Sequence, residues 1–361
     1  MNTEASSAAA PPASSAAAAT TIAAIHEDVL RAHVLTRLDG PALASAACAS
    51  SQLRSLSSER DLWANMCRST WPSTSSPLVS RVISTFPDGP RSFFSDSYSL
   101  LAAAAASPPV APGPGPSRLI SAVDIRYRGD LIFSRAVETD ADSGWFQCSP
   151  FRIDVLDPKD AVRTAIRFPD AEQAGRELGE GLRLSWVLID PAGRRAMDLS
   201  SQAPVSVQRH WLTGELHARF ATVVEAAAGG ERGTATEAVQ CGVVVTCGGW
   251  AGAAAASEEE EGKDGGGGMQ VREVGLQVED GDGMHLSGRD SLEVLGRAFG
   301  GRRRGRRERE EGERRRRYEE FERRKRERKE RKLRTEGTLD FLFVGFGVLA
   351  FALFWLLVLC R

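Results

Sequence analysis

The sequence of 361 residues lacks the short motifs that mark the common enzyme classes. It contains no GxxxxGK[ST] phosphate-binding loop, no GxSxG nucleophile elbow, no HExxH zinc motif and no GxGxxG dinucleotide fingerprint. Such motifs place backbone amides, nucleophiles or metal ligands where their chemistry needs them. Because none is present, we predict that the chain is not an enzyme and that it uses no cofactor and no metal ion.

Cysteine is scarce, and its spacing is poor for a metal site or a disulfide framework. None of the six cysteines belongs to a CxxC pair, and no histidine pair accompanies them at zinc spacing. Cys241 and Cys247 are six residues apart, which fits a weak ligand pair, but buried strand thiols are the favoured interpretation. An Asn-x-Ser/Thr sequon is also absent. These features suit a main body in a reducing, cytosolic compartment.

A secretory signal is missing as well. Residues 1–20 are rich in alanine and serine, with no basic region and no leucine-rich core, so we predict a disordered lead-in at residues 1–21. A second low-complexity stretch at residues 102–116 predicts a linker, and the glycine-rich residues 248–268 predict a flexible insert.

The formal net charge is only −2, yet the charges are distributed unevenly. Residues 302–334 carry 19 basic and 9 acidic residues, with seven acid-to-base pairs four residues apart in the favourable order. Such pairs stabilise a solvated helix, so we predict a charged helix or arm at residues 301–338. A basic arm suits an anionic lipid surface. Nucleic-acid binding is a rival interpretation, weakened because nearly every arginine has a glutamate neighbour.

Apolar residues recur at helical spacing between residues 25 and 67. One group begins at Val29 and a second at Leu43. Pro41 suits the first turn of the second helix, and a capping-box spacing predicts that a third helix starts at Ser58. Three short helices in about 43 residues bury a poor core alone. We therefore expect this unit to pack against a partner.

This stretch resembles an F-box, the helical module by which substrate receptors dock on the Skp-family adaptor of a cullin–RING ubiquitin ligase. Ile25-His26 stands at the family's Leu-Pro position, and Leu62-Trp63 matches its Leu-Trp pair. His26 thus replaces the family's proline, and Leu53 lies where a tryptophan is common. The alternative is an ordinary three-helix domain. The resemblance implies adaptor binding through ten positions: Ile25, Asp28, Val29, Leu30, Val34, Leu35, Leu38, Leu43, Leu62 and Trp63.

Residues 118–300 consist of short runs rich in Val, Ile, Phe, Trp and Arg. Nine such runs are separated by turn signals such as Asp190-Pro191-Ala192-Gly193. Runs of this kind without intervening helices favour an antiparallel sandwich or barrel. Two helical segments are nevertheless predicted, an acidic one at residues 170–181 and a short one from Asp290 to Phe299.

Aromatic residues and histidines in this region receive structural interpretations. The aromatic segment from Phe86 to Tyr98 is expected to pack onto the following domain. Trp186 and Trp211 are expected in the core, with ligand stacking as the alternative. His210 and His217 would lie on opposite faces of one continuous strand, so a shared metal site would need a turn between them.

The aromatic motifs of this region also carry a resemblance to a plant F-box subfamily with a C-terminal β domain. The likeness covers roughly residues 25–300 and implies no particular substrate. The motifs that carry it are Phe86–Tyr98, Gly144-Trp145-Phe146, Leu184-Ser185-Trp186 and Val205–Trp211.

The segment from Phe341 to Cys360 holds 20 uncharged and almost wholly apolar residues. A helix of that length spans about 30 Å, which matches the hydrocarbon core of a bilayer. It predicts a transmembrane helix at residues 339–360, with the preceding body cytosolic because the basic arm comes before it. The expectation is a tail-anchored protein of the endoplasmic reticulum or another endomembrane.

The predicted fold class is α+β: a three-helix F-box, an antiparallel β-sandwich-like or barrel-like middle domain, a charged helix and a single transmembrane helix. The predicted parts are a lead-in (1–21), an F-box (22–68), a linker with an aromatic loop (69–117), a β-rich substrate-recognition domain (118–300), a charged arm (301–338) and an anchor (339–360). The predicted function is a membrane-tethered substrate receptor of an SCF-type ligase, whose partners are the adaptor, a cullin and an unidentified protein substrate. The alternatives are a membrane-anchored scaffold outside ubiquitination and a nucleic-acid-binding protein.

Overall fold

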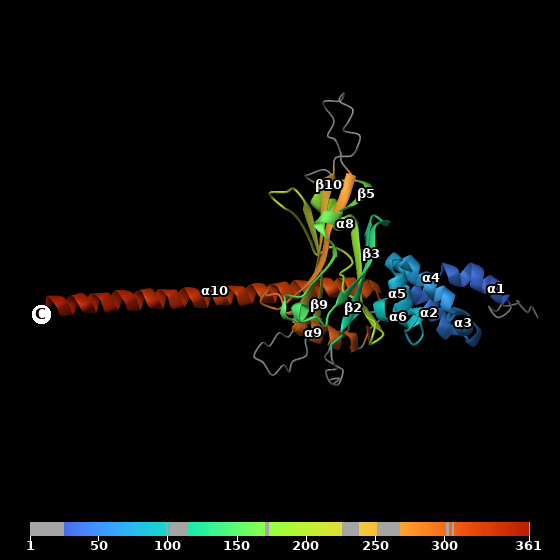
Figure 1. Cartoon of the computed structure of the whole chain (residues 1–361), viewed down its shortest axis with the longest axis horizontal. Helices are drawn as coiled ribbons and strands as arrows, with labels where there is room; N and C mark the ends of the chain where they lie inside the picture. The colour runs from blue at the N-terminus through green and yellow to red at the C-terminus, as the bar shows by residue number, and fades with distance from the viewer. Residues whose placement is uncertain are drawn as a thin grey trace, which may run out of the picture. The chain divides into compact units, whose positions relative to one another are not determined.

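The computed structural model describes residues 25–98, 100–101, 115–169, 173–225, 238–250, 268–300, 303–304 and 307–360 (Figure 1). The predicted lead-in at residues 1–21 lies outside the described residues, as do most of the predicted linker at 102–116 and most of the predicted insert at 248–268. By its internal contacts the chain divides into two compact units, Met1–Trp63 and Ala64–Arg361.

Short helices build the first unit. They are α1 (Glu27–Val29), the π-helix η2 (Leu30–Val34), the 3₁₀-helix η3 (Leu35–Arg37), α2 (Gly40–Ala49), α3 (Ser51–Ser57) and the first residues of α4 (Arg60–Thr70). Pro41 lies in the first turn of α2 as predicted, and the Asp39 side chain caps that helix by accepting the N–H of Ala42. The extended backbone of Ser50 separates α2 from α3, so the second predicted helix is two helices. Ser58 is the C-cap of α3, and α4 begins two residues later.

The second unit contains two antiparallel sheets. The first has the order β3-β2-β6-β7, and the second has the order β4-β11-β10-β9-β8, with β5 also paired to β11. The first sheet consists of β2 (Arg118–Tyr127), β3 (Asp130–Asp140), β6 (Leu182–Asp190) and β7 (Arg195–Asp198). The second consists of β4 (Arg152–Leu156), β5 (Val162–Arg167), β8 (Ser206–Arg209), β9 (Leu216–Glu225), β10 (Ala238–Trp250) and β11 (Gly268–Glu279). The predicted antiparallel β architecture is confirmed.

Shorter elements surround these sheets. The helices are η4 (Pro72–Ser75), α5 (Pro77–Ile83), α6 (Pro90–Tyr98), α7 (Gly144–Cys148), η6 (Pro158–Asp160), α8 (Ala174–Gly181), α9 (Gly288–Gly300) and α10 (Arg307–Leu359). A two-stranded pairing joins β1 (Leu100–Leu101) to β12 (Arg303–Arg304). Helices α8 and α9 correspond to the two helical segments predicted from the sequence, although residues 170–172 lie outside the described part.

One apolar core lies between the two sheets. Trp186 of β6, Val243 of β10 and Leu276 of β11 are among its fully buried residues, so both sheets contribute to it. The Trp186 indole N–H donates to the Ser121 hydroxyl at 3.2 Å, which satisfies its polar atom inside the core. Trp186 is therefore a core residue, as predicted. Trp211 is not: its side chain is 88% exposed because β8 ends at Arg209 and Trp211 lies in the turn before β9.

A helical layer covers the outer face of the first sheet. Asp124 of β2 is buried there and accepts hydrogen bonds from the Ser73 N–H (2.9 Å) and the Ser73 hydroxyl (2.6 Å) of η4. Phe93 of α6 meets Trp71 edge to face at 5.9 Å between ring centroids, and α6 packs on β7. The expected packing of the Phe86–Tyr98 segment onto the following domain is thus observed.

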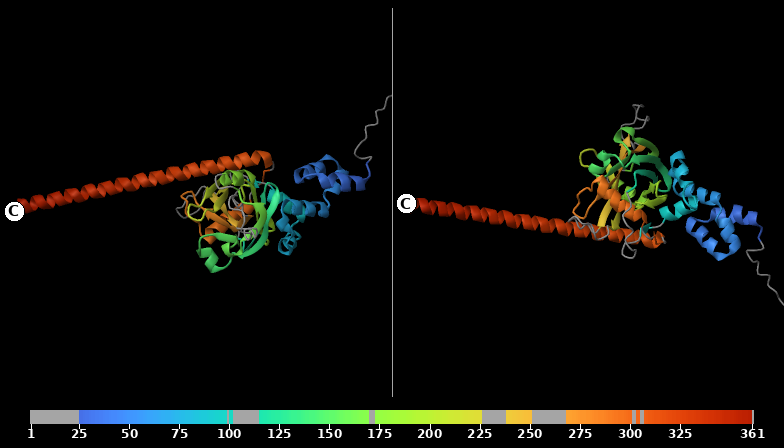
Figure 2. Two further views of the ribbon diagram at one scale, coloured as in Figure 1. Left: turned by 90° about the horizontal axis from the view of Figure 1, so that it is seen from above. Right: turned by 60° about the horizontal axis from the view of Figure 1, so that its bottom comes forward.

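Helix α10 begins against the second unit and continues past it (Figure 2). Its first half contacts β9: the Lys325 ammonium lies 2.9 Å from the Glu279 carboxylate, and Phe321 is buried. The Arg314 guanidinium also donates to the Ser200 carbonyl. The predicted charged arm is therefore helical, but half of it is attached to the β domain instead of being a solvated spacer.

The predicted transmembrane helix is contradicted. Among the described residues, no helix is both long and apolar enough to cross a membrane. The described apolar side chains of α10 run from Phe343 to Leu359, roughly 26 Å of helix, which is shorter than a hydrocarbon core of roughly 30 Å. The tail anchor at residues 339–360 and the single-pass endomembrane localisation are corrected accordingly, and the predicted membrane and anionic-lipid partners have no support.

Candidate functional site

The ten predicted adaptor-binding positions separate into a buried and an exposed set. The buried set comprises Leu30, Leu35, Leu43, Leu62 and Trp63. Leu38 is half-buried, whereas the exposed set comprises Ile25, Asp28, Val29 and Val34. The first set holds the helical unit together, so the exposed set is the part that a partner can reach.

The two exposed valines face the same way because the stretch from Glu27 to Arg37 is not a uniform α-helix. In η2 the N–H of Leu35 donates to the carbonyl of Leu30, five residues earlier. Residues five apart in an α-helix point about 140° away from each other, whereas a π turn brings them to the same side. Leu30 and Leu35 therefore both enter the core, and Val29 and Val34 both face outward.

Sequence analysis missed this π turn because it searched for a period of 3.6 residues. A duplicated pair five residues apart, Val29-Leu30 and Val34-Leu35, is the signal that could have revealed it. At the start of the stretch, the His26 imidazole accepts the N–H of Asp28 at 3.3 Å and so caps α1. The Asp28 carboxylate also pairs with Arg31 at the surface.

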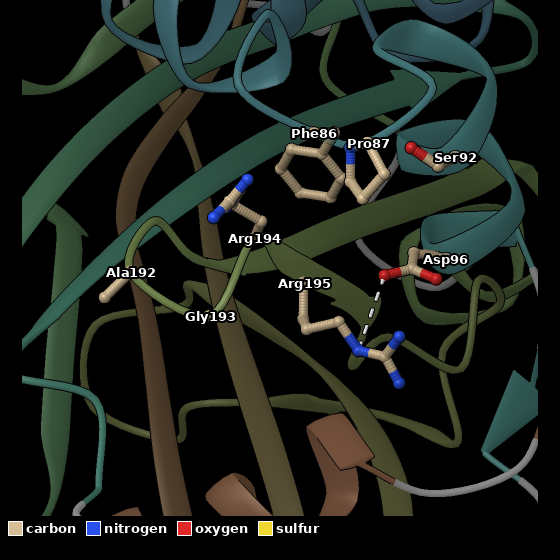
Figure 3. Close-up of a pocket in the computed structure, with 8 residues that line it drawn as sticks. All are labelled: Phe86, Pro87, Ser92, Asp96, Ala192, Gly193, Arg194 and Arg195. Carbon is tan, nitrogen blue, oxygen red and sulfur yellow. Dashed lines mark ion pairs between the residues drawn. The ribbon is translucent and has the colours of Figure 1, made fainter.

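A pocket of about 410 Å³ lies in the second unit, between the β6–β7 turn and the start of α6 (Figure 3). One wall comes from the turn and the other from the segment that leads into α6. Its lining residues are Phe86, Pro87, Ser92, Asp96, Ala192, Gly193, Arg194 and Arg195. The sequence predicted a turn at one wall and packing at the other, but gave no sign that the two would meet.

The turn fixes where the first arginine of the pocket lies. The Asp190 carboxylate accepts the N–H groups of Ala192 and Gly193, both at 3.0 Å. Arg194 follows with φ of 52°, in the left-handed region that side chains larger than glycine seldom adopt. Its guanidinium points toward the ring of Phe86 (Figure 3). Arg194 makes no ion pair or hydrogen bond with the described residues.

The second arginine is held in place. The Nε atom of Arg195 lies 3.9 Å from the Asp96 carboxylate and donates to the Phe299 carbonyl at 3.1 Å. Two guanidinium groups and one carboxylate line the pocket, so its net charge is positive.

The histidine pair lies in a different arrangement from the one predicted. The rings of His210 and His217 stack with centroids 5.6 Å apart. They belong to two sides of a hairpin, in which Gln208 pairs with His217, so the prediction of opposite faces of one strand is wrong. Thr213 donates its N–H to Nδ1 of His210 at 3.2 Å. Within the described part of the chain, no three potential metal ligands come together.

The two central cysteines are buried strand thiols, as the favoured interpretation held. Cys241 and Cys247 both lie in β10 and in the core. Burial raises the pKa of each thiol to about 12, so neither is a thiolate at neutral pH. Their environment is therefore that of small apolar side chains.

A helical unit with outward apolar residues, followed by a β domain with a separate pocket, has the features of an interaction protein with two binding surfaces. A probable F-box protein of Arabidopsis thaliana is 45% identical to the chain over 343 residues, which cover 94% of this chain and 93% of that protein. Two further F-box proteins of the same plant are 42% and 43% identical over 287 and 286 residues, each 78% of this chain and 80% and 75% of their own lengths. No family model and no solved structure matches. The chain belongs to the plant F-box protein family.

Proposed function

We propose that the chain is the substrate-recognition subunit of an SCF-type cullin–RING ubiquitin ligase. The helical unit, residues 22–68, binds the Skp-family adaptor and through it the cullin. The β-rich domain, residues 118–300, selects the protein to be modified. Ubiquitin transfer belongs to the partner subunits, so the chain itself contributes binding and not catalysis.

The outward apolar row is the observation that supports adaptor binding. Ile25, Val29 and Val34 are exposed on a unit whose inner leucines are already fully buried. Such side chains gain about 1.5–3 kcal/mol each when a partner covers them completely. A row of three is enough to anchor a contact whose rim is formed by polar residues such as Asp28.

The test is capture of a recombinant Skp-family adaptor and cullin by the full chain. The informative variant is the double change Val29→Asp and Val34→Asp, at side chains 45% and 42% exposed. A matched control is Leu131→Asp in β3, at a side chain that is 44% exposed. We expect the double variant to lose at least about 100-fold in adaptor affinity, because two carboxylates would be desolvated at the contact. The control should bind like the wild type.

Leu35→Asp would be a poor test, because Leu35 is buried and a charge there would unfold the unit itself. Circular dichroism should show unchanged helicity for the double variant. Wild-type adaptor capture by that variant would remove the row from the docking surface. A wild-type chain that captures neither adaptor nor cullin would contradict the proposal and favour a scaffold whose helices bind another protein.

A further inference from the structure

We infer that the pocket between the β6–β7 turn and α6 binds one anionic side chain of a substrate peptide, a carboxylate or a phosphate. This inference rests on the proposed function, since it gives a chemical class to the substrate that the β domain selects. The pocket lies entirely within the second unit and is separate from the adaptor-binding helices.

The argument starts from the free cation. Arg194 is exposed and has no anionic partner among the described residues. A guanidinium presents parallel N–H donors that match the two oxygens of a carboxylate or phosphate. Arg195, by contrast, is already held by Asp96 and by the Phe299 carbonyl. The pocket therefore offers one unmatched positive charge, which is the complement of one anionic group.

The backbone around Arg194 is built to hold the residue there. Left-handed conformations of non-glycine residues persist where the surrounding structure enforces them, and they gather at binding sites. Here Asp190 enforces the turn by accepting two N–H groups. At Gly193 a Cβ would come within 2.3 Å of an Asp190 carboxylate oxygen, so a side chain there would displace that carboxylate. The turn thus presents Arg194 to the pocket by a specific arrangement of its neighbours.

The other wall suits the carbon atoms next to the anionic group. Phe86 is buried and packs edge to face on Phe93, with 5.6 Å between ring centroids, so its ring cannot turn away. Pro87 extends the same apolar wall. The Asp96 carboxylate lies beyond them and would repel a second negative charge. These features favour a single acidic or phosphorylated residue within an otherwise apolar segment.

The experiment measures the binding of fluorescein-labelled peptides to the full chain in complex with the adaptor. One scaffold, Gly-Ala-Leu-X-Leu-Ala-Gly, carries glutamate, phosphoserine, glutamine or serine at X. We expect the glutamate or the phosphoserine peptide, or both, to bind at least about tenfold tighter than the matching neutral peptide. The preference should fall with added salt, because an exposed charge pair is screened. Preference for phosphoserine alone would identify a phosphorylated substrate, and equal preference an acidic one.

Two arginine variants in the same backbone conformation make the test specific. Arg194→Asn removes the charge but keeps a residue that tolerates positive φ, and we expect it to abolish the preference while leaving the neutral peptides unchanged. Arg128→Asn is the control, because Arg128 lies at φ of 51° in the β2–β3 turn and pairs with Glu177 outside the pocket. It should behave like the wild type.

Three results would overturn the inference: acidic and neutral peptides that bind alike, a preference that survives Arg194→Asn, or no binding of either anionic peptide below about 1 mM. Adaptor capture is scored on the same preparations. A chain that captures the adaptor but shows no preference keeps the proposed function and loses this site. A chain that shows the preference but captures no adaptor has the reverse outcome.

Discussion

The two units of this protein treat their apolar side chains in opposite ways. The helical unit leaves Ile25, Val29 and Val34 in solvent, although its inner leucines already fill its core. The β domain encloses its apolar residues between two sheets and presents charged groups such as Arg194 at its pocket. The first surface can gain affinity by burial alone, whereas the second must select a ligand by charge. One chain can therefore bind a constant partner and a variable one without the two surfaces competing.

Removing the central tryptophan of the β domain should have the largest effect on this contrast. We expect Trp186→Ala to cost about 3–5 kcal/mol in the free energy of unfolding, because it leaves a cavity between the two sheets. Urea denaturation would measure this loss. Trp211→Ala, at an exposed side chain, should cost no more than about 0.5 kcal/mol.

Adaptor capture by the Trp186→Ala chain would sharpen the comparison further. If the two units are independent, the variant should still bind the adaptor while its β domain is unfolded. Loss of capture together with the β domain would show that the helical unit depends on the second unit for its own stability.

The buried carboxylate under the helical layer gives the next largest effect. Asp124→Ala would leave the Ser73 N–H and hydroxyl and the Ser134 hydroxyl without their acceptor. We expect a loss of about 2–3 kcal/mol in the free energy of unfolding. Thermal denaturation is the measurement, with Asp130→Ala at an exposed strand end as the control. An unchanged midpoint would mean that the layer does not depend on this cluster.

The same residue makes stability depend on pH. Burial raises the pKa of Asp124 above its ordinary 3.8 in spite of the hydrogen bonds from Ser73 and Ser134. The native state therefore binds this proton more tightly than the unfolded state, and its contribution to stability declines as pH rises from 3.8 through the raised pKa. Asp124→Asn removes the titration, so its stability relative to the wild type should increase with pH across that window. A constant difference would contradict the raised pKa.

Local patterns predicted the parts of the fold that depend on neighbouring residues. Asp39 and Pro41 signalled the start of α2, and Trp186 and Cys241 were placed correctly in buried strands. In each case a short apolar or capping pattern is sufficient, because the interaction lies within one element or one sheet face. The class of the chain was predictable for the same reason, since the F-box motifs are short and lie close together.

Interactions between distant residues escaped the sequence. The pocket joins Phe86 and Arg194, which are far apart in the chain, and no local pattern links them. The run that contains Trp145 was assigned to a strand, but the Ser143 hydroxyl caps a short helix, α7, by accepting the N–H of Phe146. The apolar segment at residues 341–360 was assigned to a bilayer from its composition, although it is the continuation of a helix that begins against β9.

The attachment of α10 to β9 should respond more weakly than the core. Glu279 accepts from Arg219 and Lys325, at 2.8 and 2.9 Å, and it is largely buried. We expect Glu279→Gln to cost about 1–2 kcal/mol in the free energy of unfolding, because two charged donors lose their anionic acceptor. Glu320→Gln, which affects only an exposed pair with Arg324, should cost no more than about 0.5 kcal/mol.

The pH dependence of this attachment has the opposite sign to that of Asp124. Burial alone would raise the pKa of Glu279, but the hydrogen bond from Lys325 and the charges of Arg219 and Lys325 outweigh it and hold the pKa below its ordinary 4.5. The stabilisation is present above pH 4.5 and is lost as the pH falls through the lowered value. Hydrogen exchange of the α10 amides across this range is the measurement. Protection that does not change with acidification would show that apolar contacts such as Phe321 hold the helix without the ion pairs.

The smallest effect should come from restoring the family's proline in the helical unit. His26 has φ of −59°, close to the value that a proline ring fixes. Only the weak cap to the Asp28 N–H, at an exposed site, would be lost. Proline in turn lowers the entropy of the unfolded chain, which stabilises by about 0.4–1 kcal/mol where the backbone fits. We therefore expect His26→Pro to leave the free energy of unfolding nearly unchanged and adaptor affinity equal or slightly tighter.

A second histidine in the same helical stretch provides the control for this prediction. His33 lies inside η2 and is exposed, so the same substitution there removes a similar side chain from the surface. Proline within a helix interior costs about 3 kcal/mol or more, and at His33 it would destroy the π turn that aligns Val29 with Val34. We expect His33→Pro to abolish adaptor capture in a titration where His26→Pro retains it. Equal loss in both variants would place His26 inside the helix and shift the row of contact residues by at least one position.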